Sequence, residues 1–515
     1  MKKSWVVVSL LALSTILFAG CQESSTAING EAEAQENISI TEPAEEMASG
    51  QDATGKLGWM YSDTAQACTQ HNIDFDQHLK IGEYIESEGD REAAVDKALA
   101  EGIINEEQAE IVKFMFNDKP QVDLATANQM ENDLLESVGY TPAEGGYPIV
   151  STNVTTFYNV TGEIEEPKPG EPFYGQDAHY QLTPSDYTDN GDGTITDNVT
   201  GLMWQKAPDQ GKKLTWEAAM TGLDDFNAKK LGGHDDWRIP TIKELYSINQ
   251  FSGVFRRGVC EIPFFDDEYF VAMDLINPGD RPLDVQTITS TIYDSVTLGG
   301  TTTMFGYNFR DAYTKGYPST KTFTLYHVRG NTHYGQNMFV DNGDGTISDL
   351  ATGLMWMTGD SGWFNAGDAA NGTLNWEDAL SWCEGLKFAG NTDWRLPSTK
   401  ELHSIVDYTR SPDTTDSPAI DPLFQCTEIM NMAGMKDWGY YWTGTPFGDR
   451  TSIYVSFGRG MGLMGDYPMD VHGAGCQRGD RRDADRAEVP RHGGPQGDEG
   501  RTFNMVRAVR TIDID

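Results

Sequence analysis

One pattern of apolar and polar positions occurs twice along this chain. Residues 187–204 read YTDNGDGTITDNVTGLMW, and residues 340–356 read VDNGDGTISDLATGLMW. In each, an Asn-Gly pair separates short stretches of alternating apolar and polar residues, which predicts a β-hairpin. Further on, DWRIPTIKEL at 236–245 returns as DWRLPSTKEL at 393–402. The repeat predicts two copies of one domain, each long enough to bury its own core and fold independently.

Two helices and a group of strands are predicted in each copy. Thr215 and Asn375 are suitable N-caps for the first helix, which we expect to end near Gly233 or Gly390. The second helix begins at a capping box, formed by Thr241 with Glu244 in copy one and by Ser398 with Glu401 in copy two. Strands follow at 289–291, 304–310 and 325–329, and at 441–445, 452–459 and 505–510. Helices followed by an antiparallel sheet indicate an α+β fold.

The first residues predict export. A charged start, an apolar run at 5–18 and the small residues Ala19 and Gly20 before Cys21 describe a signal peptide. The run is shorter than a membrane-spanning helix requires. Small residues before a cysteine resemble a bacterial lipobox, in which Cys21 carries the lipid; an ordinary signal peptide that contains a cysteine is the alternative. Gln22 in place of aspartate then implies an outer-membrane lipoprotein, facing either the periplasm or the cell surface.

The pattern divides the chain into six segments. We expect a lipoprotein signal peptide at 1–20, a disordered tether at 21–56, a small helical region at 57–140, a linker at 141–176, copy one at 177–330 and copy two at 331–515. The tether is rich in Glu, Ser, Thr and Ala, so it buries too little apolar surface to fold. In the helical region, one helix ends at Gly102, a second opens after Asn105 and a third spans 124–138.

The charge of the chain excludes one class of partner. Its 38 Lys and Arg stand against 79 Asp and Glu, for a formal net charge of −41, which repels phosphate backbones, so we expect no nucleic-acid binding. Five cysteines remain besides Cys21, and an odd number leaves one unpaired. Their pairing is open. They are Cys68, Cys260, Cys383, Cys426 and Cys476.

The Asp-Asn-Gly-Asp-Gly-Thr stretches invite a calcium interpretation. An EF-type loop needs an oxygen ligand at position one and a glutamate at position twelve. Thr188 or Val340 stands at position one, and Val199 or Ala351 at position twelve. A hairpin turn explains the same residues, so calcium is disfavoured and no cofactor is expected.

The combined motifs DNGDGT, TGLMW, DWR(L/I)P(S/T)xKEL, YWT and VRxVR resemble the Lcl C-terminal domain family, named for a Legionella collagen-like adhesin. The Trp-Arg-Leu-Pro stretch and the closing Val-Arg strand distantly resemble the formylglycine-generating enzyme group, whose fold is C-type-lectin-like. The resemblance implies two tandem C-type-lectin-like domains, each with two helices, a twisted antiparallel sheet and long loops, after a small helical N-terminal region. Copy two keeps a long loop at 470–502 that copy one lacks.

One departure from the family concerns a cysteine. Members often carry a cysteine in the last strand that pairs with a helix cysteine like Cys383, but that position is Ala508 here. The resemblance therefore leaves Cys383 to pair with Cys426 or Cys476, or to remain a thiol. Ala508 also interrupts the place where a formylglycine-generating enzyme carries its reactive cysteines, and no His-x-x-x-Glu-His motif of its iron-dependent relatives is present. We therefore expect no enzyme.

The resemblance favours a lipid-anchored binding protein whose ligand is a glycan or an envelope protein. The adhesin implies sulfated glycans, yet the chain lacks an overall basic field. Exposed aromatic and acid–amide side chains on long loops suit sugars, and core packing is the alternative for each of them. The candidates lie in copy two: Trp442, Arg459, His472, Gln496 and Asp498. A structural envelope protein without a soluble ligand is the alternative function.

Overall fold

The computed structural model describes residues 91–105, 109, 146–180, 182–208, 212–256, 259–271, 281, 283–367, 371–483, 485–486 and 490–512. The chain divides into two compact units after Leu134. The first unit contains α4 (Arg91–Ala100), which is followed by Gly102 at a φ of 72°, as predicted. The signal peptide, the tether, Cys68, the third predicted helix and all of the second except Ala109 lie outside the described residues, and the Ala109 backbone nitrogen donates to the Asn105 carbonyl oxygen at 2.9 Å. Within the described part, none of the helices has the length and apolar character to cross a membrane.

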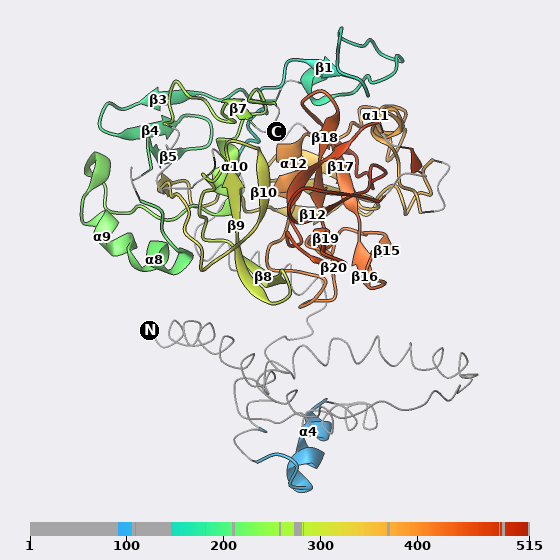
Figure 1. Cartoon of the computed structure of the whole chain (residues 1–515). Coiled ribbons are helices and arrows are strands. Elements are labelled where there is room, and N and C mark those ends of the chain that lie inside the picture. Colours follow the sequence, from blue (N-terminus) through green and yellow to red (C-terminus); the bar gives the residue numbers. More distant parts are fainter. Residues whose placement is uncertain are drawn as a thin grey trace, which may run out of the picture. The chain divides into compact units, whose positions relative to one another are not determined.

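The second unit contains both copies (Figure 1). Before copy one lie β1 (Phe157–Tyr158), β2 (Glu163–Ile164) and the 3-10 helix η2 (Asp177–His179). Copy one has β3 (Tyr187–Asp189), β4 (Thr194–Asp197), β5 (Leu202–Gln205), α8 (Trp216–Thr221), α9 (Leu223–Asn227), η3 (Leu231–Gly233), α10 (Ile242–Ser247), β6 (Val254–Arg256), β7 (Val259–Ile262), β8 (Ile292–Thr297), β9 (Thr301–Asn308), β10 (Tyr313–Pro318) and β11 (Val328–Gly330).

Copy two follows the same order with additions. Its elements are β12 (Phe339–Asp341), β13 (Thr346–Asp349), β14 (Leu354–Met357), α11 (Trp376–Glu384), α12 (Thr399–Ser404), β15 (Glu428–Met430), β16 (Lys436–Trp438), β17 (Tyr440–Phe447), β18 (Thr451–Ser456), β19 (Met461–Met464), β20 (Tyr467–Asp470), β21 (Gln477–Arg481), β22 (Arg491–Gly493), β23 (Asp498–Gly500) and β24 (Val509–Thr511). Short helices and antiparallel sheets thus make up each copy.

The predicted hairpins and helix caps are confirmed, whereas the strand predicted at 289–291 begins only at Ile292 and the strand predicted at 505–510 begins only at Val509. β3 pairs with β4, and β12 with β13, as antiparallel hairpins. In the first turn Asp192 Oδ1 accepts hydrogen bonds from the Thr194 backbone nitrogen and hydroxyl, so this carboxylate stabilises its own turn. Thr215 and Asn375 cap α8 and α11, and both predicted capping boxes form. The first helix ends earlier than expected, at Gly222 in copy one and Gly385 in copy two, because glycine disfavours helix continuation.

The central sheet is shared between the copies. Its strand order is β17-β18-β21-β10-β9-β8, so each copy supplies three strands. The copies meet where Thr314 of β10 lies opposite Gln477 of β21 in an antiparallel pair. The order reads the same from either edge when the copies are exchanged, which places a pseudo-twofold axis between β10 and β21. Each copy also has a four-stranded sheet, β11-β5-β4-β3 or β12-β13-β14-β24.

The segment 470–502, predicted as a loop, contributes β21 to the middle of this sheet, so the loop prediction is wrong for that part. The strand reads Gln-Arg-Gly-Asp-Arg and lacks apolar alternation. Two of its three charges are satisfied inside the protein, because Arg478 pairs with Asp498 and Asp480 accepts a hydrogen bond from Asn504 Nδ2 at 3.0 Å. Polar strands of this kind have no hydrophobic period that would indicate them.

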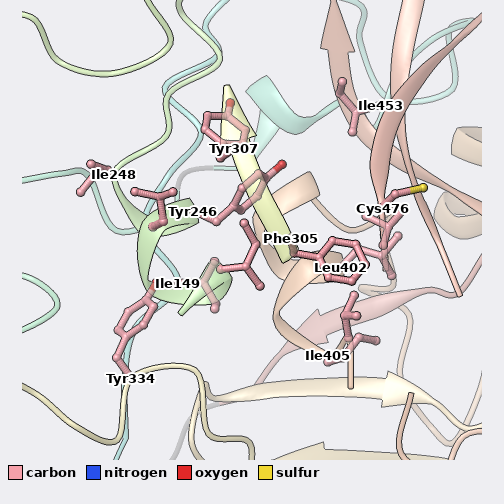
Figure 2. Close-up of a cluster of buried hydrophobic side chains, with 14 of the residues drawn as sticks. Ile149, Tyr246, Ile248, Phe305, Tyr307, Tyr334, Leu402, Ile405, Ile453 and Cys476 are labelled. Carbon is pink, nitrogen blue, oxygen red and sulfur yellow. The ribbon is translucent and has the colours of Figure 1, made fainter. Parts of the chain in front are cut away.

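The hydrophobic core also spans both copies (Figure 2). Tyr246 on α10 stacks on His403 of α12 with 4.1 Å between ring centroids, and its hydroxyl lies 2.8 Å from Thr399 Oγ1. Leu402 and Ile405 of copy two belong to the same buried cluster. A shared sheet and a shared core join the copies into one unit, which differs from the expectation of two independent folds.

The cysteines that the structure describes are free thiols, so the thiol alternative holds for Cys383. Cys383 lies on α11 inside a second core cluster, formed by copy two together with Phe173 of the preceding linker, and burial raises its pKa well above the usual value. Cys476 is buried in the shared core, and burial raises its pKa too. Burial of this kind makes a thiol unreactive.

Candidate functional site

A cleft of about 530 Å³ lies at the junction of the two copies. Copy one supplies α10, the residues just before it and the start of β8; copy two supplies the chain after α12. The segment that connects the copies completes the lining. Six of the lining residues carry the chemistry: Arg238, Lys243, Thr291, Asn337, Asp407 and Tyr408. A cavity of this size is within the range of small-ligand sites.

The DWR motif and the capping box together place Arg238 at the cleft. Pro240 and the box turn the chain into α10, where Glu244 Oε2 accepts a hydrogen bond from the Thr241 backbone nitrogen at 2.8 Å. The other Glu244 oxygen pairs with the Arg238 guanidinium, which also lies 3.3 Å from the Asn331 carbonyl oxygen. This carboxylate is the main partner of the Arg238 side chain.

Lys243 follows on α10 and provides a positive charge. Its Nζ donates to Asn337 Oδ1 at 3.0 Å and to the Gly335 carbonyl oxygen at 3.2 Å. Burial lowers the pKa of Lys243 to about 8, and the carboxylates of Asp349 and Asp407 act in the opposite direction. With a pKa near 8, most of the Lys243 side chains remain protonated at neutral pH.

The opposite wall comes from the chain after α12. Asp407 Oδ1 accepts hydrogen bonds from Thr409, at 2.9 Å from its backbone nitrogen and 2.6 Å from its hydroxyl. The Tyr408 hydroxyl donates to the Gly475 carbonyl oxygen at 3.0 Å and lies 2.9 Å from His403 Nε2. Burial lowers the pKa of His403 to about 3, so this imidazole is neutral. Carboxylate, amide and ammonium groups beside aromatic rings suit a ligand with many hydroxyls.

None of the five predicted site residues lines this cleft, and two of them, Trp442 and Arg459, are held by contacts within copy two. Trp442 on β17 is fully buried, and its Nε1 donates to the Leu374 carbonyl oxygen at 2.9 Å. Arg459 pairs with Asp413 at 2.6 Å and donates to the Lys436 carbonyl oxygen at 3.0 Å. The structure does not bring these two together with the other three.

The other three form one charged cluster where the copies meet. His472 Nε2 lies 2.9 Å from Asp498 Oδ1, and Asp498 also pairs with Arg478. Lys315 of β10 in copy one donates to Gln496 Oε1 at 2.6 Å. Burial would raise the pKa of Asp498, but Arg478 and His472 lower it below the usual range. Burial lowers the pKa of His472 to about 3 and that of Lys315 to about 8.

A smaller cavity, of about 240 Å³, lies within copy two. The segment 470–502 contributes Arg486 and Arg501 to its lining, beside Tyr440 and Phe503. Arg501 lies over the Tyr440 ring at 3.7 Å from its centroid and pairs with Glu499 at 2.9 Å. None of the five predicted residues lines this cavity.

Sequence reasoning missed the residues of the cleft, although one signal pointed to them. Tyr334-Gly335-Gln336-Asn337 repeats Tyr174-Gly175-Gln176-Asp177, and each tetrapeptide precedes the hairpin of a copy. The repeat therefore begins before the DNGDGT motif, and its first residues contact the other copy.

The two repeats match a known family. The model of the Lcl C-terminal domain matches residues 193–329 and 345–470, together just over half of the chain. No curated protein and no solved structure matches the chain. Both matched segments carry the capping-box helix and strands of the central sheet, and the second segment ends before β21. The chain therefore belongs to the Lcl C-terminal domain family, with two tandem copies of that domain.

Proposed function

We propose that this protein is an exported outer-membrane lipoprotein, anchored through Cys21, which binds a glycan without catalysis or a cofactor. The family supports an adhesin-like envelope protein. The proposal that the protein binds a ligand rests on the cleft between the copies, because charged, amide and aromatic groups line one cavity of suitable size. The C-type-lectin-like fold implied by the sequence stays part of this proposal.

The cleft replaces the five residues of copy two as the proposed site. Trp442 and His472 are almost fully buried and have no surface to offer a ligand. Asp498 and Gln496 are engaged by Arg478 and Lys315. In the cleft, Asp407 of copy two lines the same cavity as Lys243 of copy one, so one ligand can contact both copies.

A glycan array probed with the full-length chain, with and without calcium, tests the binding. Asp407→Asn removes a charge from the cleft but keeps the shape and the acceptor for Thr409. We expect this variant to lose bound signal by about tenfold or more, because a charged hydrogen-bond partner of the ligand is removed. Asp449→Asn, at an exposed position outside the cleft, is the matched control and should bind like wild type. Equal binding by Asp407→Asn and wild type would show that the ligand lies elsewhere.

The anchor is tested separately. Metabolic labelling with palmitate should mark the wild-type chain, and Cys21→Ala should abolish the label and release the protein from the membrane fraction. Retention of the label by Cys21→Ala would overturn the lipoprotein assignment without affecting the cleft.

A further inference from the structure

The same hydroxyl position has different surroundings in the two copies. In copy two, Thr445 Oγ1 accepts a hydrogen bond from the Thr399 backbone nitrogen at 2.9 Å. In copy one, Thr291 Oγ1 accepts one from the Ile242 backbone nitrogen at 3.0 Å. A threonine hydroxyl is also a donor. Each of these hydroxyls can therefore also donate a hydrogen bond to a second partner.

In copy two that partner belongs to the protein itself. Thr445 Oγ1 donates to Asp177 Oδ2 at 2.5 Å, and Thr152 Oγ1 donates to the same oxygen at 2.8 Å. Asp177 is part of η2, in the segment before copy one. Three residues later, Tyr180 covers the guanidinium of Arg395, which lies 5.1 Å from the ring centroid. In copy two, the Asp177 carboxylate thus lies beside the Thr445 hydroxyl and the Tyr180 ring lies beside the Arg395 guanidinium.

In copy one the equivalent space, beside the Thr291 hydroxyl, opens into the cleft. Thr291 lines the cleft, and among the residues that the structure describes its hydroxyl has no acceptor. Arg238, the counterpart of Arg395, also lines the cleft, and its side chain is 28% exposed where that of Arg395 is 6% exposed.

The segment that connects the two copies does not fill the space beside the Thr291 hydroxyl. Asn337, the counterpart of Asp177, stands 5 residues before Asn342, whereas Asp177 stands 13 before Asn190. Its side chain bonds to Asp349 Oδ2 at 2.8 Å and to Lys243 at 3.0 Å instead. The shorter connection therefore leaves Thr291 facing the cavity.

The charges around the two hydroxyls correspond as well. The Asp177 carboxylate interacts with the positive charges of Arg395 and Lys400. Their counterparts in copy one, Arg238 and Lys243, both line the cleft. The negative charge of Asp407 lies on the opposite wall, where it favours the hydroxyls of a ligand as hydrogen-bond donors over a second carboxylate.

We propose that the part of the cleft lined by Thr291, Arg238 and Lys243 binds the carboxylate of a hexuronate residue, which accepts a hydrogen bond from the Thr291 hydroxyl. This assignment rests on the proposed glycan binding and names the class of sugar. The hydroxyls of the sugar ring point toward Asp407. Copy two supplies the same interaction internally through Asp177, so the protein shows the geometry of the contact in its own structure.

Ser290 favours a sugar over a peptide segment. Its counterpart in copy two is Gly444, where an added β-carbon would lie 3.2 Å from the Asp177 backbone nitrogen and 3.6 Å from the Gly175 carbonyl oxygen. The Gly175–Asp177 main chain therefore passes so close to Gly444 that a side chain there would require the main chain to shift. Ser290 has a side chain there, directed to the Pro240 carbonyl oxygen at 3.3 Å. A main chain that crossed copy one in the same way would meet the Ser290 side chain, whereas a carboxylate can enter from the open side of the cleft.

Saturation-transfer NMR with the full-length chain tests the assignment. The probes are methyl glucuronide, galacturonide and mannuronide, each compared with its neutral methyl hexoside. We expect at least one uronide to bind about tenfold more tightly than its neutral partner, which is the scale of one charge-assisted hydrogen bond. Thr291→Val should remove the preference and Thr291→Ser should retain it. Thr445→Val, the matched variant in copy two, should lower the melting temperature but keep the preference.

The outcomes separate this inference from the proposed function. If every uronide and its neutral hexoside bind equally, or if Thr291→Val keeps the preference, the carboxylate subsite is wrong while glycan binding by the cleft stands. Failure of all three uronides to bind also overturns the subsite, and the glycan array then decides about the cleft. Tighter binding of the acetylated peptide amide Asp-Ala-His-Tyr than of any uronide would assign the place to a peptide instead.

Discussion

The substitution Lys400→Met should stabilise the protein, although it removes a hydrogen bond. Lys400 lies on α12 with its side chain about 5% exposed, and Nζ donates to the Ser247 carbonyl oxygen at 2.7 Å. Among the described residues it forms no ion pair. Burial lowers its pKa from 10.5 to about 7, even though the carboxylates of Asp197 and Asp177 favour the charged form.

The size of the effect follows from that pKa. One pKa unit corresponds to about 1.4 kcal/mol, so the shift from 10.5 to about 7 corresponds to roughly 4–5 kcal/mol of unfavourable free energy for the buried ammonium. Leaving the Ser247 carbonyl oxygen unpaired costs about 1–2 kcal/mol. Methionine has a similar length and no charge, so we expect a net gain of about 2–4 kcal/mol in the free energy of unfolding.

The gain should depend on pH in a defined direction. The pKa of Lys400 is lower in the folded state than in the unfolded state. The destabilisation of the wild-type fold by this side chain is therefore absent above pH 10.5 and grows as the pH falls toward 7. The advantage of Lys400→Met should therefore be largest at pH 7 and below and should shrink toward pH 10.

Urea unfolding of the full chain, followed by tryptophan fluorescence at pH 6 and pH 9.5, measures the difference. Lys243→Met is the matched control, because Lys243 holds the equivalent position in copy one but has two acceptors and a pKa of about 8. Its gain should be smaller. A Lys400→Met variant that is less stable than wild type at pH 6, or a gain that does not change with pH, would refute the reasoning.

Three further predictions concern the core and the shared sheet. Trp442→Ala should lower the free energy of unfolding by about 3–5 kcal/mol in a urea titration, since the ring is fully buried; a change below 1 kcal/mol would contradict its place in the core. Replacing Gln477–Arg481 by Gly and Ser should abolish the cooperative thermal transition seen by circular dichroism, because β21 joins β18 to β10; an unchanged melt would contradict that pairing. Residues 331–515 alone should show no sharp transition whereas residues 135–515 should; a cooperative melt of the shorter chain would show that copy two does not need the shared core.

The parts of the fold that depend on neighbours in sequence were predictable. A capping box requires a hydroxyl residue and a glutamate three positions apart, and Thr241 with Glu244 satisfies this within one helical turn. The hairpins are equally local. The pairing of β10 with β21 joins residues more than 150 positions apart, and the polar sequence of β21 carries no sign of a buried strand.

The site was less predictable for a related reason. Trp442 was predicted as a ligand contact because exposed aromatic side chains on long loops suit sugars, but it lies on β17, which is almost entirely buried, so alternation along this strand does not mark a solvent face. Asn337 and Asp407 carry no motif of their own. They line a cavity only because two copies pack together, and that arrangement is a property of the pair rather than of either sequence.

The pseudo-twofold axis between β10 and β21 has a consequence for how such a protein can specialise. In a dimer of identical chains every substitution appears on both sides of the axis, so a change that opens one site opens two. Here the halves are encoded separately, and Ser290 and Gly444 can differ although they occupy equivalent places. The covalent connection also keeps each half at a high effective concentration for the other, independent of how dilute the protein is. Fusion of the two copies thus permits a binding site at only one of the two equivalent positions of the scaffold.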